Sequence, residues 1–147
     1  MASMRELANH IIAVANRRGF AVTHLQLQKV MFFTLGFHMR NHGIDDLAEE
    51  TYDIPFEKWK YGPVVESLYY TYNRFRDQDI TNEIEGVYSP EYIEWDDNIA
   101  KLLQIDVFDL VKISHDLPSW ADYEDDILSR NYVDSYTLPE IANDFAI

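Results

Sequence analysis

The sequence predicts a mainly α-helical protein (α+β at most): a compact single-domain helical bundle around a buried central helix, with a short edge strand or hairpin. Three observations predict it. Capping boxes, in which Ser or Thr is followed three residues later by Glu or Gln, open three segments. Apolar residues recur at helical spacing, and one segment is apolar on nearly all sides. At 147 residues the chain can bury one good core, so we expect a single domain over residues 1–147.

The first helix is predicted to begin after Ser3 and to end before Gly19. Ser3 and Glu6 form the first capping box. An apolar stripe follows, and two arginines suit the helix end. A glycine directly after such a stripe is typical of the left-handed residue that terminates a helix.

The second helix is predicted to be the buried one. Thr23 and Gln26 form its capping box, and it should end near Gly43. Its apolar residues surround the helix axis, which favours burial on all sides. Gly36 lies within it at a cost of roughly 1 kcal/mol relative to Ala, so we expect a close crossing there.

The segment after this helix alternates apolar and polar residues. Tyr52, Ile54 and Phe56 alternate with Asp, Pro and Glu, as in a half-buried strand. Pro55 would confine that strand to a sheet edge, because proline lacks the N–H that a ladder needs. We therefore expect a short edge strand over residues 52–56.

The second half of the chain carries weaker signals. Residues 80–95 are predicted to form a short hairpin or a loop packed on the core, and residues 100–113 one or two helices. A short helix is expected after Pro118. Thr137 and Glu140 form the third capping box and predict a final short helix.

Composition excludes several classes of protein. The chain has no cysteine, so disulfides, thiolate catalysis and cysteine-based zinc sites are ruled out. No window approaches the length of a membrane span, and the N-terminal residues lack a signal-peptide pattern. We expect a cytoplasmic protein without membrane contact.

Charge is strongly asymmetric along the chain. The net charge is −14. Residues 1–74 hold eight basic and eight acidic residues, whereas residues 75–147 hold four basic and eighteen acidic ones. Such an excess repels nucleic-acid phosphates, so we expect no direct nucleic acid binding. It would attract a basic protein, although a solvated acidic surface kept for solubility is an equally simple interpretation.

Signals for catalysis or metal binding are weak. His38 and His42 are four residues apart, which can place two imidazoles on one metal. We expect instead a partly buried His38 and an exposed His42. His115 between Ser114 and Asp116 does not make a triad, because neighbours in sequence need not converge. We therefore predict no enzyme, no metal and no cofactor.

The most informative segment is Trp-Lys-Tyr-Gly-Pro-Val-Val at residues 59–65. Gly62 permits a sharp bend or a positive φ, and Pro63 suits the first turn of a helix that would continue to Phe75. The segment could be a core corner with Trp59 packed inside, or an aromatic surface for a partner. Both hold if one face is buried and the other exposed.

This segment and an earlier one resemble a known family. Residues 23–33, followed by Gly-Phe-His at 36–38, are similar to the T-x-L-x-L-Q-K-L-x-Y-Y, then G-x-H block of the Panacea domain family, the phage-associated SocA-like and GepA-like proteins. In that family a W-K-Y-G-P-V-V block follows, as at residues 59–65 here. The resemblance implies a shared fold over most of the chain.

A third block of the family lies near the C-terminus. Residues 110–115 and the Pro and Trp that follow resemble its L-x-x-x-S-H-x-x-x-P-W block. Ser119 separates Pro118 from Trp120, which departs slightly from the pattern. The resemblance implies that His115 and Trp120 shape a corner of the fold.

The resemblance also implies a function. Panacea domains act as antitoxins, binding and neutralising a protein toxin encoded next to them, and SocA-like members are linked to delivering a toxin to a protease. The partner-binding residues are a hypothesis from motif position and composition: Trp59, Tyr61, Tyr69, Tyr72, His115, Trp120, Asp122, Glu124, Asp125 and Asp126. The alternative is a phage-encoded acidic anti-defence protein that blocks a host nuclease or CRISPR effector.

Overall fold

The computed structural model describes residues 1–146 and confirms the predicted mainly α-helical class. Its only sheet within these residues is a two-stranded antiparallel hairpin, β1 (Glu57–Trp59) and β2 (Gly62–Val64). Three 3-10 helices are η1 (Asn73–Phe75), η2 (Ile80–Asn82) and η3 (Pro90–Trp95). The α-helices are α1 (Met4–Arg18), α2 (His24–His42), α3 (Asp46–Thr51), α4 (Glu66–Tyr72), α5 (Asp96–Leu103), α6 (Val107–Asp116), α7 (Pro118–Ala121), α8 (Glu124–Leu128) and α9 (Leu138–Phe145).

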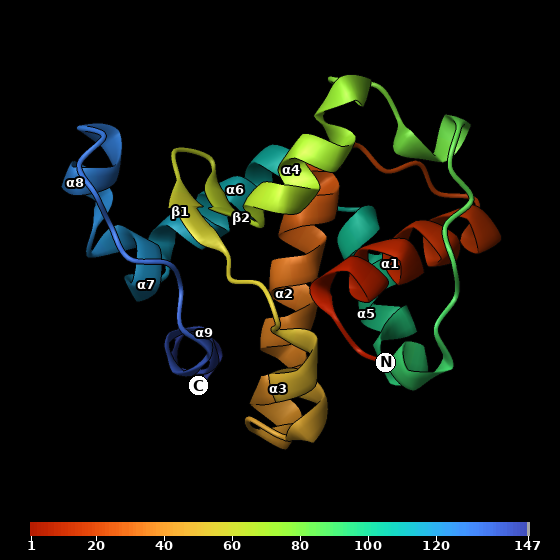
Figure 1. Ribbon diagram of the computed structural model, residues 1–147, viewed down its shortest axis with the longest axis horizontal. Coiled ribbons are helices and arrows are strands. Elements are labelled where there is room, and N and C mark those ends of the chain that lie inside the picture. Colours follow the sequence, from red (N-terminus) through yellow and green to blue (C-terminus); the bar gives the residue numbers. More distant parts are fainter. Residues whose placement is uncertain (147) are drawn as a thin grey trace.

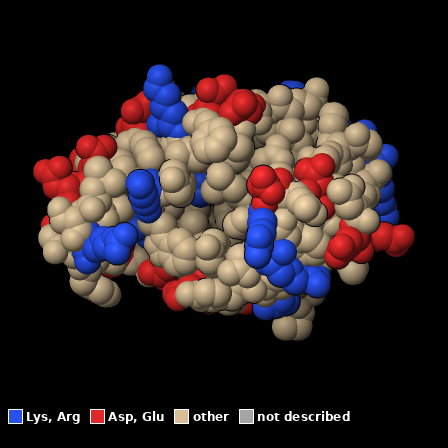
Figure 2. Space-filling model, turned by 90° about the horizontal axis from the view of Figure 1, so that it is seen from above, with Lys and Arg blue, Asp and Glu red and all other residues tan. Residues whose placement is uncertain are grey.

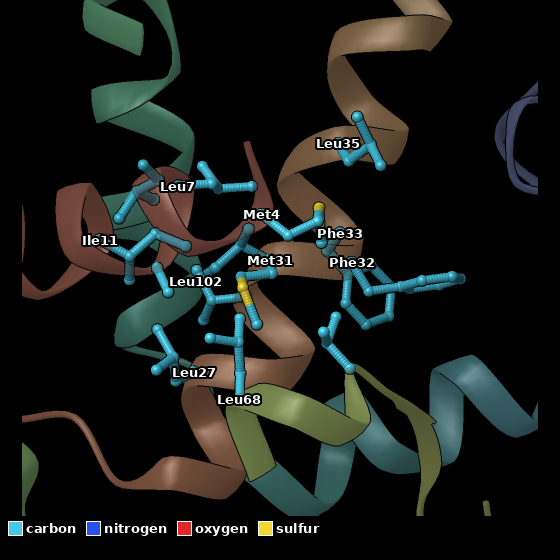
Figure 3. Close-up of a cluster of buried hydrophobic side chains, with 14 of the residues drawn as sticks. Met4, Leu7, Ile11, Leu27, Met31, Phe32, Phe33, Leu35, Leu68 and Leu102 are labelled. Atoms are coloured by element: carbon cyan, nitrogen blue, oxygen red, sulfur yellow. The ribbon is translucent and has the colours of Figure 1, made fainter. Parts of the chain in front are cut away.

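The long helix α2 is the central element, as predicted. In Figure 1 it runs through the middle of the molecule, with α1 and α5 on one side and the hairpin, α6 and α9 on the other. Its middle turns are buried from residue 27 to residue 36. Figure 3 shows side chains of α2 meeting those of α1, α4 and α5 in one apolar cluster. Their burial supplies the main drive for folding.

The capping signals are mostly confirmed. Thr23 and Gln26 make both bonds of a capping box, and Thr137 and the residue three later do the same. Ser3 accepts the backbone N–H three residues on at 3.0 Å. The Glu6 carboxylate does not return the bond, because it accepts from the hydroxyl of Ser89 at 2.9 Å instead. The first predicted box is therefore half formed.

The glycine inside α2 marks a close approach, as expected. A Cβ on Gly36 would lie 2.3 to 2.6 Å from three ring atoms of Phe145. That ring comes from α9, at the other end of the chain, and packs against Phe33 and Phe37 of α2. Gly36 thus lets the last helix seat an aromatic ring against the central one.

The predicted helix start at Pro63 is wrong. Pro63 lies in β2 opposite Lys58, and α4 begins only at Glu66. The reason is a long-range contact that local sequence does not reveal. The Gln28 side chain accepts from the Val65 N–H at 2.8 Å and donates to the Val65 carbonyl at 3.2 Å, which holds this residue extended.

The predicted edge strand over residues 52–56 is also wrong. Tyr52 directly follows α3, and residues 53–56 form a loop. The Tyr52 hydroxyl accepts from the Phe56 N–H at 2.9 Å and donates to the Tyr136 carbonyl at 2.7 Å. Side-chain bonds therefore replace the expected ladder, and the strand begins at Glu57.

The second half follows the sequence signals more loosely. Residues 80–95 form η2, a stretch without regular structure and η3, so the predicted hairpin is wrong and the predicted loop packed on the core is closer to the structure. Residues 96–116 form two helices, α5 and α6, and α7 begins at Pro118 as expected. The final helix α9 begins after Thr137, and its Phe145 reaches the core.

Candidate functional site

Three segments far apart in the sequence converge beside the first half of α2. They are Gln28 and Lys29 on α2, the hairpin with its flanks (residues 59–65), and residues 114–120 at the junction of α6 and α7. We call this cluster the hairpin site. In Figure 1 the hairpin lies to the left of α2, and α6 lies next to β2 and contacts α2 as well.

Lys29 is the buried centre of the hairpin site. It is 0% exposed, and its Nζ donates to the Pro63 carbonyl at 2.9 Å. Among residues 1–146, no carboxylate lies within ion-pair distance of it. Burial lowers the pKa of the Lys29 ammonium to about 7. The amine is therefore held partly neutral near physiological pH, in contact with the backbone of the hairpin.

The hairpin backbone lies directly on its neighbours at Gly62. This residue has φ +99°, which an L side chain rarely adopts. A Cβ here would lie 2.6 Å from the Ser114 Oγ and 3.2 Å from the Lys29 Cε. Glycine is needed both for the turn and for the close approach of hairpin, α2 and α6.

Two aromatic residues from α6 and α7 hold the hairpin from the other side. The rings of His115 and Trp120 are stacked, with centroids 3.7 Å apart and planes at 12°. Trp120 is 1% exposed, and its indole N–H donates to the Trp59 carbonyl at 2.9 Å. Burial lowers the pKa of His115, which favours its neutral form. The corner implied by the resemblance to the third block is therefore present.

Above this buried layer lies an open, largely apolar pocket. Its volume is about 320 Å³. The centroids of the Trp59 and Tyr69 rings are 5.0 Å apart, and those of the His24 and Tyr69 rings are 5.7 Å apart. Figure 2 looks onto this end of the molecule and shows a hollow near its centre. We call the pocket of about 320 Å³ the aromatic pocket; its lining is His24, Leu25, Gln28, Trp59, Lys60, Tyr61, Val64 and Tyr69.

The predicted aromatic residues fall into two layers. Trp59 and Tyr69 are half-buried in the wall of the aromatic pocket, and Tyr61 is exposed at its rim. Tyr72 and Trp120 are buried in the core and present little surface. The first three can touch a partner directly, whereas the last two can act only by supporting them.

The predicted acidic residues lie beside the hairpin site but outside the aromatic pocket. All four carboxylates between Asp122 and Asp126 are exposed, on the turn after α7 and on α8, and we call them the acidic segment. None of them lines the aromatic pocket. Figure 2 shows acidic and basic side chains interspersed on the face that carries the hollow. The charge asymmetry along the sequence therefore does not produce one uniform face there.

Sequence reasoning missed several residues of the hairpin site and the aromatic pocket, among them His24, Gln28, Lys29 and Lys60. A signal for Lys29 was available, because it lies between Leu27 and Val30 in a helix predicted to be buried on all sides. Charged residues are almost never fully buried without a partner, so such a lysine marks a special environment. His24 gave no comparable signal, since it lies in an exposed-looking first turn.

The other histidines considered in the sequence are held by structural contacts. His38 is buried and His42 exposed, as expected. The His38 Nδ1 accepts from the Trp95 indole at 3.1 Å, and its Nε2 lies 2.9 Å from the Asp45 carboxylate. Both ring nitrogens of His38 therefore have partners within the fold, and His42 stacks on the His38 ring. The two histidines thus have a packing role.

One of three comparisons with known proteins gives a match, and it covers the segments that form the hairpin site. Within residues 1–146, no helix combines the length and apolar character that crossing a membrane requires. Comparison with curated proteins gives no match, and neither does comparison with solved structures. A family model described as "Antitoxin SocA-like, Panacea domain" matches residues 27–121, a range that begins just before Lys29 and ends just after Trp120. The chain belongs to the SocA-like antitoxin family of Panacea domains.

Proposed function

We propose that this protein is the antitoxin of a toxin–antitoxin system and neutralises a partner toxin by binding it directly. Membership of the family suggests a non-catalytic regulator with a protein partner. The proposal goes further, because it names the mode of action as occlusion by the hairpin site. We also propose that the protein works in the cytoplasm, without binding nucleic acid.

One observation carries the proposal. The segments that resemble the second and third blocks of the family, residues 59–65 and 110–120, meet beside Lys29 of the first block, where Lys29 binds the Pro63 carbonyl and Trp120 binds the Trp59 carbonyl. A buried layer fixes the hairpin, and the half-buried Trp59 and Tyr69 and the exposed Tyr61 surround a pocket. Large, rigid aromatic rings at a preorganised pocket are typical anchors of protein interfaces.

The acidic segment supplies the second element of the proposal. Its four exposed carboxylates attract a basic partner over a distance comparable to the screening length. Such charges speed encounter more than they strengthen the final complex. We therefore assign the aromatic residues to affinity and the acidic segment to the rate of association.

The alternative is an acidic anti-defence protein that blocks a nuclease or CRISPR effector. The net charge of −14 favours it, because carboxylates can compete with phosphates for a basic cleft. Displacement of the protein from a nuclease by DNA, in a salt-dependent way, would favour this alternative. A toxin gene next to its own would favour the antitoxin.

The test is co-expression with the product of the neighbouring gene. We expect the neighbour to arrest growth alone, and this chain to restore growth and co-purify with it. A toxic neighbour that is neither bound nor neutralised contradicts the proposal for that pair. Repeating the rescue in cells that lack the main ATP-dependent proteases separates direct neutralisation, which persists there, from delivery to a protease, which is lost.

A further inference from the structure

Two pockets lie on either side of Trp59 and Lys60. The first is the aromatic pocket. The second, of about 460 Å³, lies between β1 and the segment that follows α8, and both pockets are lined by these same two residues. A chain segment that crossed Trp59 and Lys60 would therefore enter one pocket with one side chain and the other pocket with its neighbours.

The aromatic pocket suits an apolar side chain. Its only charged lining residue is Lys60, at the rim. The rest of its surface comes from aromatic rings, aliphatic side chains and the amide of Gln28, which already binds the backbone at Val65. A site of this composition gains from burying apolar surface and offers few polar partners.

The second pocket is cationic, in contrast to the protein as a whole. Its charged lining residues are Glu57, Lys58, Lys60 and Arg130. Glu57 accepts from the Ser135 hydroxyl at 2.8 Å, and Lys58 pairs with the Glu140 carboxylate at 3.0 Å. Lys60 and Arg130 are exposed, and within residues 1–146 neither takes part in an ion pair.

We propose that these two pockets form one docking groove for a partner segment in which an apolar or aromatic side chain adjoins carboxylates. The apolar side chain enters the aromatic pocket, and the carboxylates lie over Lys60 and Arg130. Arginine and lysine at a pocket mouth hold carboxylates through charge-assisted bonds.

The positive charge of Lys60 and Arg130 determines which kind of partner segment the groove can bind. The net charge of −14 predicts a basic partner, yet no residue of the acidic segment lines either pocket, and the nearby Asp126 carboxylate is engaged by the lining residue Asn131, which donates to it at 3.1 Å. A wholly basic segment would bring like charges beside Lys60 and Arg130, at a cost in affinity. The partner should therefore present an acidic, apolar segment to the groove, whatever the charge of the rest of its surface.

The inference rests on the proposed function only for which protein supplies the segment. It can be tested with peptides and the intact chain alone. The probe is acetyl-Gly-Asp-Leu-Tyr-Glu-Gly-amide, and the matched control is the same peptide with both acidic residues replaced by lysine. Binding is followed through the amide and indole N–H resonances of the 15N-labelled protein, up to about 1 mM peptide.

Two of the tryptophans, Trp59 and Trp95, give an internal control. We expect the acidic peptide to shift the indole resonance of Trp59 and the amides of Lys60 and Tyr61. The indole of Trp95, which donates to His38 inside the core, should not move. The lysine peptide should bind at least about threefold more weakly, as expected for loss of exposed charge pairs.

Variants sharpen the test. Lys60→Gln should weaken the acidic peptide about threefold, and Lys101→Gln, which removes an exposed lysine that lines neither pocket, should not. Three results would each overturn the proposal: no shift at about 1 mM, equal binding of the lysine peptide, or shifts confined to residues outside the groove. Growth rescue by the wild-type chain would stand in each case, so failure of the groove remains distinct from failure of the antitoxin.

Discussion

The hairpin site and the acidic segment are neighbours built on opposite principles. The hairpin site is assembled from residues up to 92 positions apart, between 28 and 120, through buried bonds and close packing. The acidic segment is four carboxylates within five consecutive residues, 122–126, and all four are exposed. The first is preorganised and intolerant of change, and the second is a local feature of charge. Because the two features use different residues, mutations should change the affinity for the partner and the rate of association separately.

The largest effect is expected from Trp59→Ala. It removes the shared wall of both pockets but leaves the carbonyl that Trp120 needs. The toxin should bind about 2–4 kcal/mol more weakly, mainly through faster dissociation. Binding kinetics at a sensor surface measure this.

Ile93→Ala is the control for Trp59→Ala, because it removes an exposed apolar side chain of η3 that lines neither pocket. It should leave the dissociation rate unchanged. Equal effects of the two variants, both folded by circular dichroism, would contradict the separation into anchors and surroundings.

Gly62→Ala tests how tightly the hairpin is fixed. The new Cβ carries the cost of a positive φ and a clash with Ser114. Together these should lower the free energy of unfolding by about 2–4 kcal/mol. Gly19→Ala is matched, since it has φ +76° but nothing within 4 Å, and should cost only about 1–2 kcal/mol. Urea denaturation compares the two, and equal costs would mean that Ser114 yields freely.

Lys29 predicts a dependence of stability on pH. Its pKa is about 7 in the fold and 10.5 as the reference value, so the unfolded chain binds the proton more readily between these values. The free energy of unfolding should therefore rise with pH above about 7, by up to about 1.4 kcal/mol per pH unit. Below pH 7 this contribution should be flat, because the amine is charged in both states.

Lys29→Met should remove that rise, and Lys101→Met, at an exposed lysine, should keep it. Urea titrations between about pH 7 and 9 stay at least about one pH unit below the ordinary tyrosine pKa of about 10. The slope, rather than the absolute stability, is the readout, since loss of the bond to Pro63 changes stability at every pH. A slope that persists in Lys29→Met would show that another group titrates.

The smallest effect is expected from neutralising the acidic segment. Asp122→Asn, Glu124→Gln, Asp125→Asn and Asp126→Asn together should slow association with a basic toxin about tenfold at low salt. The loss should vanish near 1 M salt, where charges are screened within about 3 Å.

The control removes four other exposed carboxylates, at Asp77, Glu83, Glu85 and Glu94, with the same change in net charge. It should slow association less than the first set. If both sets slow it equally, net charge rather than the acidic segment steers the partner.

The helices could be predicted from the sequence wherever their signals are local. Thr23 with Gln26 and Thr137 with Glu140 are capping boxes in the structure, and the all-round apolar pattern identified α2 as central. Predictions failed where a distant side chain decides the backbone. Pro63 was expected to start a helix, but Gln28 and Lys29 bind the carbonyls around it and keep it extended.

The candidate site could be predicted only in part. Trp59 and Tyr61 are in the pocket because the motif that contains them forms the hairpin. Tyr72 and Trp120 are aromatic residues at helical spacing, as exposed anchors can be, yet both are buried. Which side of a helix faces the core depends on the packing of its neighbours, and composition does not carry that information.

The most direct test of the central claim is amide hydrogen exchange of this chain, free and in complex with the toxin. The account predicts that protection on binding is concentrated in residues 57–64 and in the first turn of α2, around His24 to Gln28. Protection that falls instead on the opposite side of the molecule, for example on residues 80–95, with the hairpin exchanging as in the free protein, would contradict it.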